Sequence, residues 1–140
     1  MTEKLIFPSE DWIKEYCSML SSSADYNKLG KGWQDPIQFK ITDLEKVQAS
    51  IDFKSFVLEV KDGRCEGYRL IRDDSDSAPF VLSSAYSDWK RTLEGKVNPT
   101  QAMLNGSLKV KGNMMLLMKY AAAATEMVKV AGKIETEFIV

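Results

Sequence analysis

The chain has 140 residues, 44% apolar and 28% charged, with 19 basic residues against 20 acidic ones. This length and composition predict one globular domain over residues 1–140. The net charge of -1 provides no field to attract nucleic acid or an anionic membrane. Because histidine is absent, the chain lacks the usual general base near neutral pH and the commonest metal ligand.

The two cysteines and the N-terminus bear on the expected compartment. Cys17 and Cys65 are isolated, which excludes a zinc site of several thiolates. Two separated cysteines are typical of a reducing compartment, where both are thiols, and a single disulfide is the less favoured alternative. The N-terminus lacks the apolar core of a signal peptide, and no run of about 18 apolar residues predicts a membrane span. We therefore expect a cytoplasmic protein.

The first part of the chain predicts two helices and a strand. Ser9 can cap a helix start, and the acidic residues after it suit the positive end of the helix dipole. Apolar residues then recur at helical spacing, which predicts one buried face: Trp12, Ile13, Tyr16, Cys17 and Leu20. A short helical turn over residues 24–29 is expected to stop at Gly30. Alternation of apolar and polar residues over 37–41 predicts a half-buried strand.

The middle of the chain has the pattern of antiparallel strands. Residues 42–50 are polar and can hold a helical turn. Apolar runs over residues 53–60 and 65–71 flank Asp62-Gly63, and Asp-Gly between two such runs is a strong hairpin signal. A further strand begins at Phe80, after the acidic turn 72–77. We therefore expect three antiparallel strands in a row.

Short elements follow from Ser84 onward. Residues 85–93 are expected to form a helix that ends at Gly95. Asn98 caps a second, short helix, and Pro99 takes its first position, where a missing amide proton costs nothing. Leu108 and Val110 alternate with lysines, which predicts a last strand with these two side chains pointing inward.

The last helix, expected from Met114 to about Val130, is apolar almost all the way round. Such a helix must be buried on more than one side. Three interpretations stay open: a core helix, a binding-site wall in which adaptable methionines contact a ligand, and a subunit interface. The tail 133–140 is either loose or a short added strand. The whole pattern predicts an α+β fold, with one mostly antiparallel sheet of about five strands covered on one face by helices.

Three motifs stand in order between Ser84 and Val130. A helix ends in Gly95-Lys96, a Pro-x-x-Ala turn that starts at Pro99 leads to Asn105-Gly106, and Leu-Lys-Val-Lys-Gly-Asn over residues 108–113 precedes the apolar helix. This order and spacing resemble the signature half of the sterol carrier protein 2 family. That family commonly has an acid at the last of these positions, and asparagine caps a helix as well as aspartate does. Upstream, the resemblance is limited to residues 30–33 and the order of strands.

The resemblance implies an apolar tunnel between the sheet and the helices. It implies non-catalytic binding or transfer of a lipid-like ligand (a fatty acid, acyl-CoA, sterol or phospholipid), with no metal and no cofactor. The residues expected to line the tunnel are Trp89, Leu93, Met103, Leu108, Val110, Met114, Leu117, Met118 and Ala121. The expected partner is the lipid, with at most transient membrane contact and no nucleic acid, and the chain is expected to be a monomer or a homodimer.

Two other functions compete with lipid carriage. The first is a protein-assembly or dimerisation module that uses the same apolar helix. The second is an enzyme, which the lack of a usable base disfavours. The carboxylates of Asp73, Asp74 and Asp76 lie in a turn of the kind that is usually solvated. Cys17, on an apolar helix face, is better interpreted as a small core residue than as a nucleophile.

Overall fold

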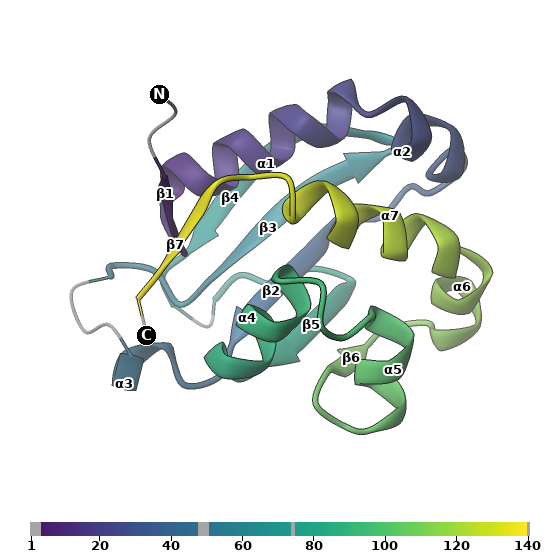
Figure 1. The fold of residues 1–140 in the computed structure, drawn as a ribbon. Coiled ribbons are helices and arrows are strands. Elements are labelled where there is room, and N and C mark those ends of the chain that lie inside the picture. Colours follow the sequence, from purple (N-terminus) through teal and green to yellow (C-terminus); the bar gives the residue numbers. More distant parts are fainter. Residues whose placement is uncertain (1–3, 48–50, 74, 140) are drawn as a thin grey trace.

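The computed structural model describes residues 4–47, 51–73 and 75–139 (Figure 1). Its centre is a five-stranded sheet in the order β4-β3-β2-β5-β6. The strands are β2 (Ile37–Ile41), β3 (Ser55–Lys61), β4 (Arg64–Ile71), β5 (Phe80–Ser84) and β6 (Lys109–Lys111). Figure 1 shows α1 (Glu10–Ser22), α4 (Tyr86–Leu93) and α7 (Ala121–Ala131) on one face of this sheet. The predicted α+β class, with a five-stranded sheet covered on one face, is confirmed.

The sheet is mixed, with one parallel pair. Strand β3 is antiparallel to both β2 and β4, and β6 is antiparallel to β5. The sequence predicted that β5 would continue the antiparallel run from β4, and this prediction is wrong. Strand β5 pairs with β2 instead, in parallel, with Phe39 opposite Leu82. The chain therefore crosses the uncovered face of the sheet between β4 and β5. The hairpin at Asp62-Gly63 is confirmed, and both residues have the positive φ that a tight Asp-Gly turn requires.

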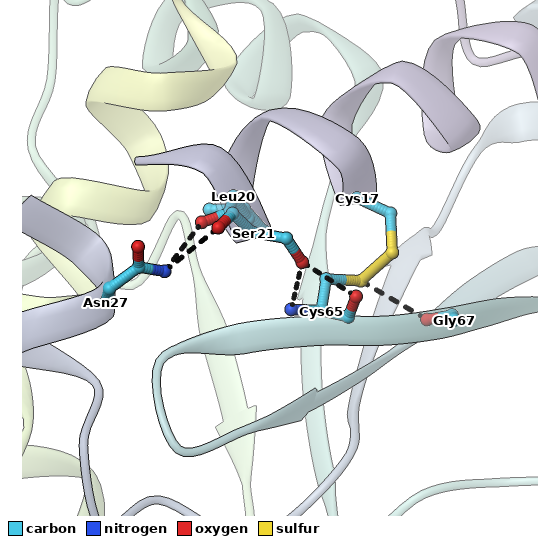
Figure 2. The surroundings of a disulfide bond; sticks show 6 residues. All are labelled: Cys17, Leu20, Ser21, Asn27, Cys65 and Gly67. Carbon is cyan, nitrogen blue, oxygen red and sulfur yellow. Dashed lines mark hydrogen bonds between the residues drawn. A yellow bond between two sulfur atoms is a disulfide. The ribbon is translucent and has the colours of Figure 1, made fainter. Parts of the chain in front are cut away.

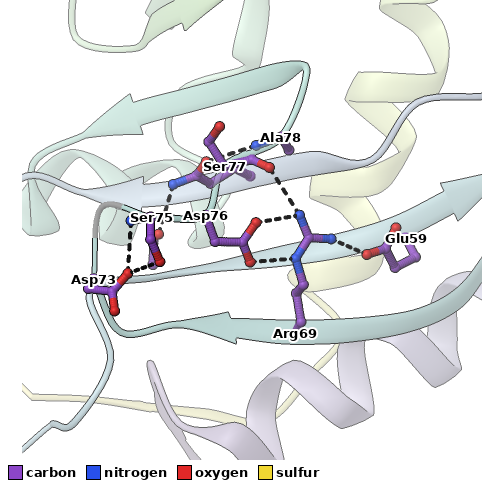
Figure 3. A network of polar contacts seen from close by, with 9 residues as sticks. Glu59, Arg69, Asp73, Ser75, Asp76, Ser77 and Ala78 are labelled. Atoms are coloured by element: carbon purple, nitrogen blue, oxygen red, sulfur yellow. Dashed lines mark hydrogen bonds and ion pairs between the residues drawn. The ribbon is translucent and has the colours of Figure 1, made fainter.

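An arginine and a buried amide hold this crossing segment (Figure 3). The Arg69 guanidinium donates to both carboxylate oxygens of Asp76 and also contacts Glu59. The side chain of Gln38 is buried, and its carbonyl accepts from the Ala78 amide at 3.3 Å. The acidic turn is thus tied to the sheet through Asp76, rather than being entirely solvated.

Helix α1 is attached to strand β4 by a disulfide (Figure 2). Cys17 and Cys65 form this bond, so the prediction of two free thiols is wrong. The Ser21 hydroxyl reinforces the attachment, because it accepts from the Cys65 amide at 2.9 Å and donates to the Cys65 carbonyl at 2.8 Å. The pairing depends on where α1 lies over the sheet, which sequence spacing does not reveal. Ser9 caps α1 through the Trp12 amide, and the five predicted residues form its buried face.

The two ends of the chain form a second, small sheet. Strand β1 (Leu5–Phe7) pairs in parallel with β7 (Thr136–Phe138), so the tail does form the added strand that was one of its two predicted states. Tyr86 joins both ends to α4, since its hydroxyl donates to the Phe7 carbonyl at 2.6 Å and accepts from the Ile139 amide at 2.9 Å.

The remaining helices are short. They are α2 (Ala24–Leu29), α3 (Leu44–Val47), α5 (Pro99–Leu104) and α6 (Met114–Lys119). Asn98 caps α5 with Pro99 at its start, as predicted. The prediction of a single last helix is wrong, because Tyr120 has non-helical angles (φ -105°, ψ 25°) and separates α6 from α7. The predicted burial on more than one side is also wrong for α6, where Leu117 is buried but Met114, Met115 and Met118 are 43%, 85% and 52% exposed.

Candidate ligand-binding interior

Two small apolar cavities lie between the sheet and the helices. The Trp33 cavity, of about 20 Å³, is lined by Tyr26, Gly30, Trp33, Ile37, Leu117, Tyr120, Ala123, Ala124 and Met127. The Trp89 cavity, of about 30 Å³, is lined by Phe7, Trp12, Tyr16, Phe39, Ile41, Phe56, Trp89, Thr92, Leu93 and Val128. All three tryptophans of the chain therefore stand in a cavity wall.

The two cavities are neighbours under α7. Met127 lines the Trp33 cavity, and Val128, the next residue, lines the Trp89 cavity. The ring of Tyr16 belongs to the Trp89 cavity, and its hydroxyl donates to the Met127 carbonyl at 2.9 Å. Tyr16 in the wall of one cavity is thus bonded to the backbone of Met127, which lines the other.

Two tyrosines in these walls, Tyr16 and Tyr26, have hydroxyls whose pKa is raised. Burial raises the pKa of the Tyr16 hydroxyl far above its usual range. Burial also raises the pKa of Tyr26 to about 12. The indole of Trp89 donates to the Lys40 carbonyl at 2.9 Å, and that of Trp33 donates to the Asp35 carbonyl at 2.5 Å. The hydroxyl of Tyr16 and the indole N–H groups of Trp33 and Trp89 are thus bonded to backbone carbonyls.

The wall of the Trp33 cavity includes the junction of α6 and α7. Leu117 from α6 and Tyr120 from the junction both line the cavity. Tyr120 packs edge-on against Trp33, with ring centroids 5.3 Å apart. A Cβ built on Gly32 would lie only 2.5 Å from the Tyr120 hydroxyl, so this close approach requires a glycine. One six-residue helix joined to α7 by one non-helical residue therefore covers this side of the interior.

A larger hollow lies elsewhere, beside the loop after β2. It measures about 510 Å³, and its lining includes Lys40, Asp43, Lys54 and Arg72. Its lining also includes Ile41, Leu44, Ile51 and Phe53, but a hydrocarbon chain there would desolvate the charged side chains without compensation. Among the described residues, no group of three or more histidine, cysteine or acidic side chains is arranged to hold a metal ion.

Comparison with known proteins gives the family of this chain. The model of the SCP-2 sterol transfer family matches residues 13–125. The chain belongs to the SCP-2 sterol transfer family. This match includes the motifs between residues 84 and 125 on which the resemblance was based, and it extends upstream through α1 and the sheet.

Relatives and solved structures agree with the SCP-2 assignment. Sterol carrier protein 2 of Arabidopsis thaliana is 28% identical over 110 residues, which are 79% of this chain and 81% of that protein. A crystal structure of sterol carrier protein 2 superposes with a TM-score of 0.81 at 30% identity, covering 90% of this chain and 97% of the other. The solution structure of a conserved hypothetical protein from Thermus thermophilus also gives 0.81, at 29% identity, covering 98% and 94%.

One group of relatives is much longer than this chain. Hydroxysteroid dehydrogenase-like protein 2 of Mus musculus is 40% identical over 55 residues, which are 39% of this chain and 11% of that protein. The chain thus corresponds to a small part of this relative. None of the described helices is long and apolar enough to cross a membrane.

The structure divides the site residues predicted from the SCP-2 resemblance into three groups. Trp89 and Leu93 line the Trp89 cavity, and Leu117 lines the Trp33 cavity. Four others pack in or against the core or lie half-buried, without lining either cavity: Met103, Leu108, Val110 and Ala121. The other two, Met114 and Met118, are 43% and 52% exposed on α6. Whether these nine residues contact a ligand stays a prediction.

Sequence reasoning missed the walls contributed by the first half of the chain. Trp12 and Tyr16 on α1 and Phe39 on β2 line the Trp89 cavity, and Trp33 lines the other. The signal is present in the sequence, because Trp12 and Tyr16 recur on the apolar face of a helix and Phe39 alternates with polar residues along a strand. The prediction stopped at the C-terminal half because the family motifs are specific there.

Proposed function

We propose that this protein binds the hydrocarbon portion of a lipid-like molecule in the region of its two apolar cavities, and carries it. The observation that supports this most directly is the paired Trp33 and Trp89 cavities, which have apolar walls inside a chain of the SCP-2 sterol transfer family. The relatives named sterol carrier protein 2 support the same ligand class.

The cavity volumes indicate that the ligand must displace part of the wall. Volumes of about 20 and 30 Å³ each hold one or two water molecules, far less than a fatty acyl chain needs. Joining them requires Tyr16 and Met127 to shift, and further room requires α6 to move outward from Trp33. The non-helical residue at Tyr120 is where α6 can pivot without breaking a helix.

The energetics favour moderate affinity with little headgroup selectivity. Burial contributes about 0.8 kcal/mol per methylene, so a chain of roughly 16 carbons gains on the order of 10 kcal/mol gross. Association and ordering cost about 4 to 15 kcal/mol. With a cost near the lower end of that range, the net gain of about 6 kcal/mol corresponds to a Kd of roughly tens of micromolar, which lets a carrier release its ligand.

We further propose that the domain catalyses no reaction. The chain has no histidine, and its interior tyrosines are held neutral by burial. The activity of the longer dehydrogenase-like relatives is not carried over, because the match spans 11% of the mouse protein. A cytoplasmic location stays a prediction, and the disulfide weakens its basis, since that argument counted Cys17 and Cys65 as thiols.

The test uses the tryptophans in the cavity walls. Delipidated protein is titrated with stearic acid that carries a doxyl group, which quenches indole fluorescence only at short range. We expect saturable quenching that unlabelled fatty acid reverses. The variant Trp33→Phe removes the indole of the Trp33 cavity, and Trp12→Phe with Trp89→Phe removes both indoles of the Trp89 cavity. The variant in which quenching is lost shows which cavity the chain occupies. Absence of displaceable quenching by fatty acyl or sterol probes would exclude the proposed function.

A matched pair of alanine variants on α7 provides the control. Ala124 lines the Trp33 cavity, whereas Ala122, two residues earlier, is exposed. Ala124→Leu adds three carbons to the space a ligand needs, so we expect binding to weaken by roughly tenfold or more. Ala122→Leu should leave affinity unchanged. Equal effects of the two substitutions would show that the ligand is not beside this wall.

A further inference from the structure

Four of the six large apolar side chains that are exposed among the described residues lie at one end of the molecule, and the other two are Ile6 and Leu29. Met114, Met115 and Met118 on α6 are 43%, 85% and 52% exposed, and Leu104 at the end of α5 is 84% exposed. Figure 1 shows α5, β6 and α6 together at the end away from both termini. We call these four side chains, together with Lys109, Lys111 and Lys119, the α6 surface. Side chains of this size are seldom left in water in such numbers without a function.

The charge of this end differs from that of the whole chain. No acidic residue stands between Glu94 and Glu126, whereas four lysines do, at 96, 109, 111 and 119. Of the 19 basic residues, 15 remain for the rest of the chain, against all 20 acidic ones. The net charge of -1 therefore combines a basic end with an acidic remainder. The net charge alone indicated no field that would attract an anionic membrane, and that conclusion does not apply to this surface.

The lysines of the α6 surface are available to a partner. Lys109 and Lys111 are exposed on β6, directly before α6, and Lys119 is exposed at its end. None of these three forms an ion pair with a described residue. The exposed side of α1 is different, because it carries Glu10, Asp11 and Glu15. A surface with both apolar and basic side chains is complementary to a partner whose outer layer carries anionic groups and whose inner layer is hydrocarbon.

We propose that the α6 surface docks on an anionic lipid bilayer, with its methionines and Leu104 inserted at the interface and its lysines on the headgroups. This inference rests on the proposed function, for which it supplies the route of lipid exchange. Leu117 on the inner side of α6 lines the Trp33 cavity, while Met115 and Met118 face outward. The helix that would contact the bilayer is thus the helix that covers the cavity.

A second copy of the chain fits this surface less well. A two-fold dimer would place the same patch on itself, so the lysines of one copy would meet those of the other. Like charges brought together in this way oppose association. An anionic bilayer lowers the free energy of the same lysines.

The experiment is flotation of the full chain with vesicles of phosphatidylcholine, with and without roughly a third phosphatidylglycerol. We expect binding to the anionic vesicles only, decreasing with salt. Lys111→Glu should weaken it by about fivefold or more, since one lysine near the surface contributes about a factor of five. Met115→Asp with Met118→Asp should weaken it by about tenfold or more. Lys14→Glu for the first variant, and Ser18→Asp with Ser22→Asp for the second, are charge-matched controls at exposed sites on α1 and should have no effect.

The outcomes separate this inference from the proposed function. Lys111→Glu and the α1 controls are also titrated with the doxyl-labelled fatty acid in solution, where affinity should be unchanged. If the protein binds fatty acid but not anionic vesicles, or if the α1 controls weaken vesicle binding as much, the docking surface is wrong and the proposed function stands. If the wild-type chain is a dimer that Met115→Asp with Met118→Asp dissociates, and vesicles are not bound, a second copy is the occupant. Vesicle binding without displaceable fatty acid binding would instead contradict the proposed function.

Discussion

Reduction of the disulfide between Cys17 and Cys65 should lower the stability of this protein substantially. The bond closes a loop with a sequence separation of 48 residues. In the chain-entropy description, a loop of this length restricts the unfolded chain by about 4 kcal/mol at 25 °C. A chain of this size loses about 3 to 4 °C in Tm per kcal/mol, so we expect a decrease of about 14 °C. The hydrogen bonds of Ser21 to the Cys65 backbone persist after reduction, so α1 should remain docked in the native state.

Urea unfolding of the oxidised and reduced protein measures this difference, with mass spectrometry after alkylation to count thiols. The double variant Cys17→Ala with Cys65→Ala is the control. Its urea midpoint should match that of the reduced protein and should not change when reductant is added. If both cysteines of the purified protein are alkylated without reductant, the disulfide is absent. If the midpoint is the same before and after a verified reduction, the loop-closure reasoning is refuted.

Three other predictions follow from single residues. Because the pKa of Tyr16 is raised above its ordinary 10.0, its stabilisation is complete below pH 10 and is lost as pH rises beyond it. Tyr16→Phe should thus flatten the alkaline decline in unfolding free energy by about 1.4 kcal/mol per pH unit, measured by urea titrations at several pH values. Gly112 has φ +139, and an added Cβ would lie 2.6 Å from the Phe80 ring, so Gly112→Ala should cost about 2 kcal/mol or more. Gly67→Ala, which meets open space, is its control and should change the midpoint little. Arg69→Ala should cost at most about 1 kcal/mol, and less at high salt, because its ion pairs are partly exposed.

Local elements were predictable from the sequence because each depends on residues a few positions apart. Ser9 and Asn98 cap helices through amides three residues onward, and Asp62-Gly63 makes its turn from its own backbone freedom. The buried face of α1 follows from the helical repeat alone. The motifs after Ser84 also indicated the family, which the match over residues 13–125 confirms.

The tertiary structure decided what depends on distant residues meeting. Strand β5 lies beside β2 because the chain crosses the uncovered face, where Arg69 and Gln38 hold it. The last helix breaks at Tyr120, although the alanines after it favour a helix, and at this break the Tyr120 ring packs against Trp33 in the space that Gly32 leaves.

The same distinction explains the candidate site. A repeat of apolar residues shows that a helix has an apolar side, but not whether protein, ligand or solvent covers that side. The sequence therefore determined that α6 is apolar and lies among lysines. Only the packing of α6 over Trp33 decided that Leu117 faces a cavity while Met115 faces outward. The pairing of Cys17 with Cys65 was decided in the same way, because it requires α1 to lie over β4.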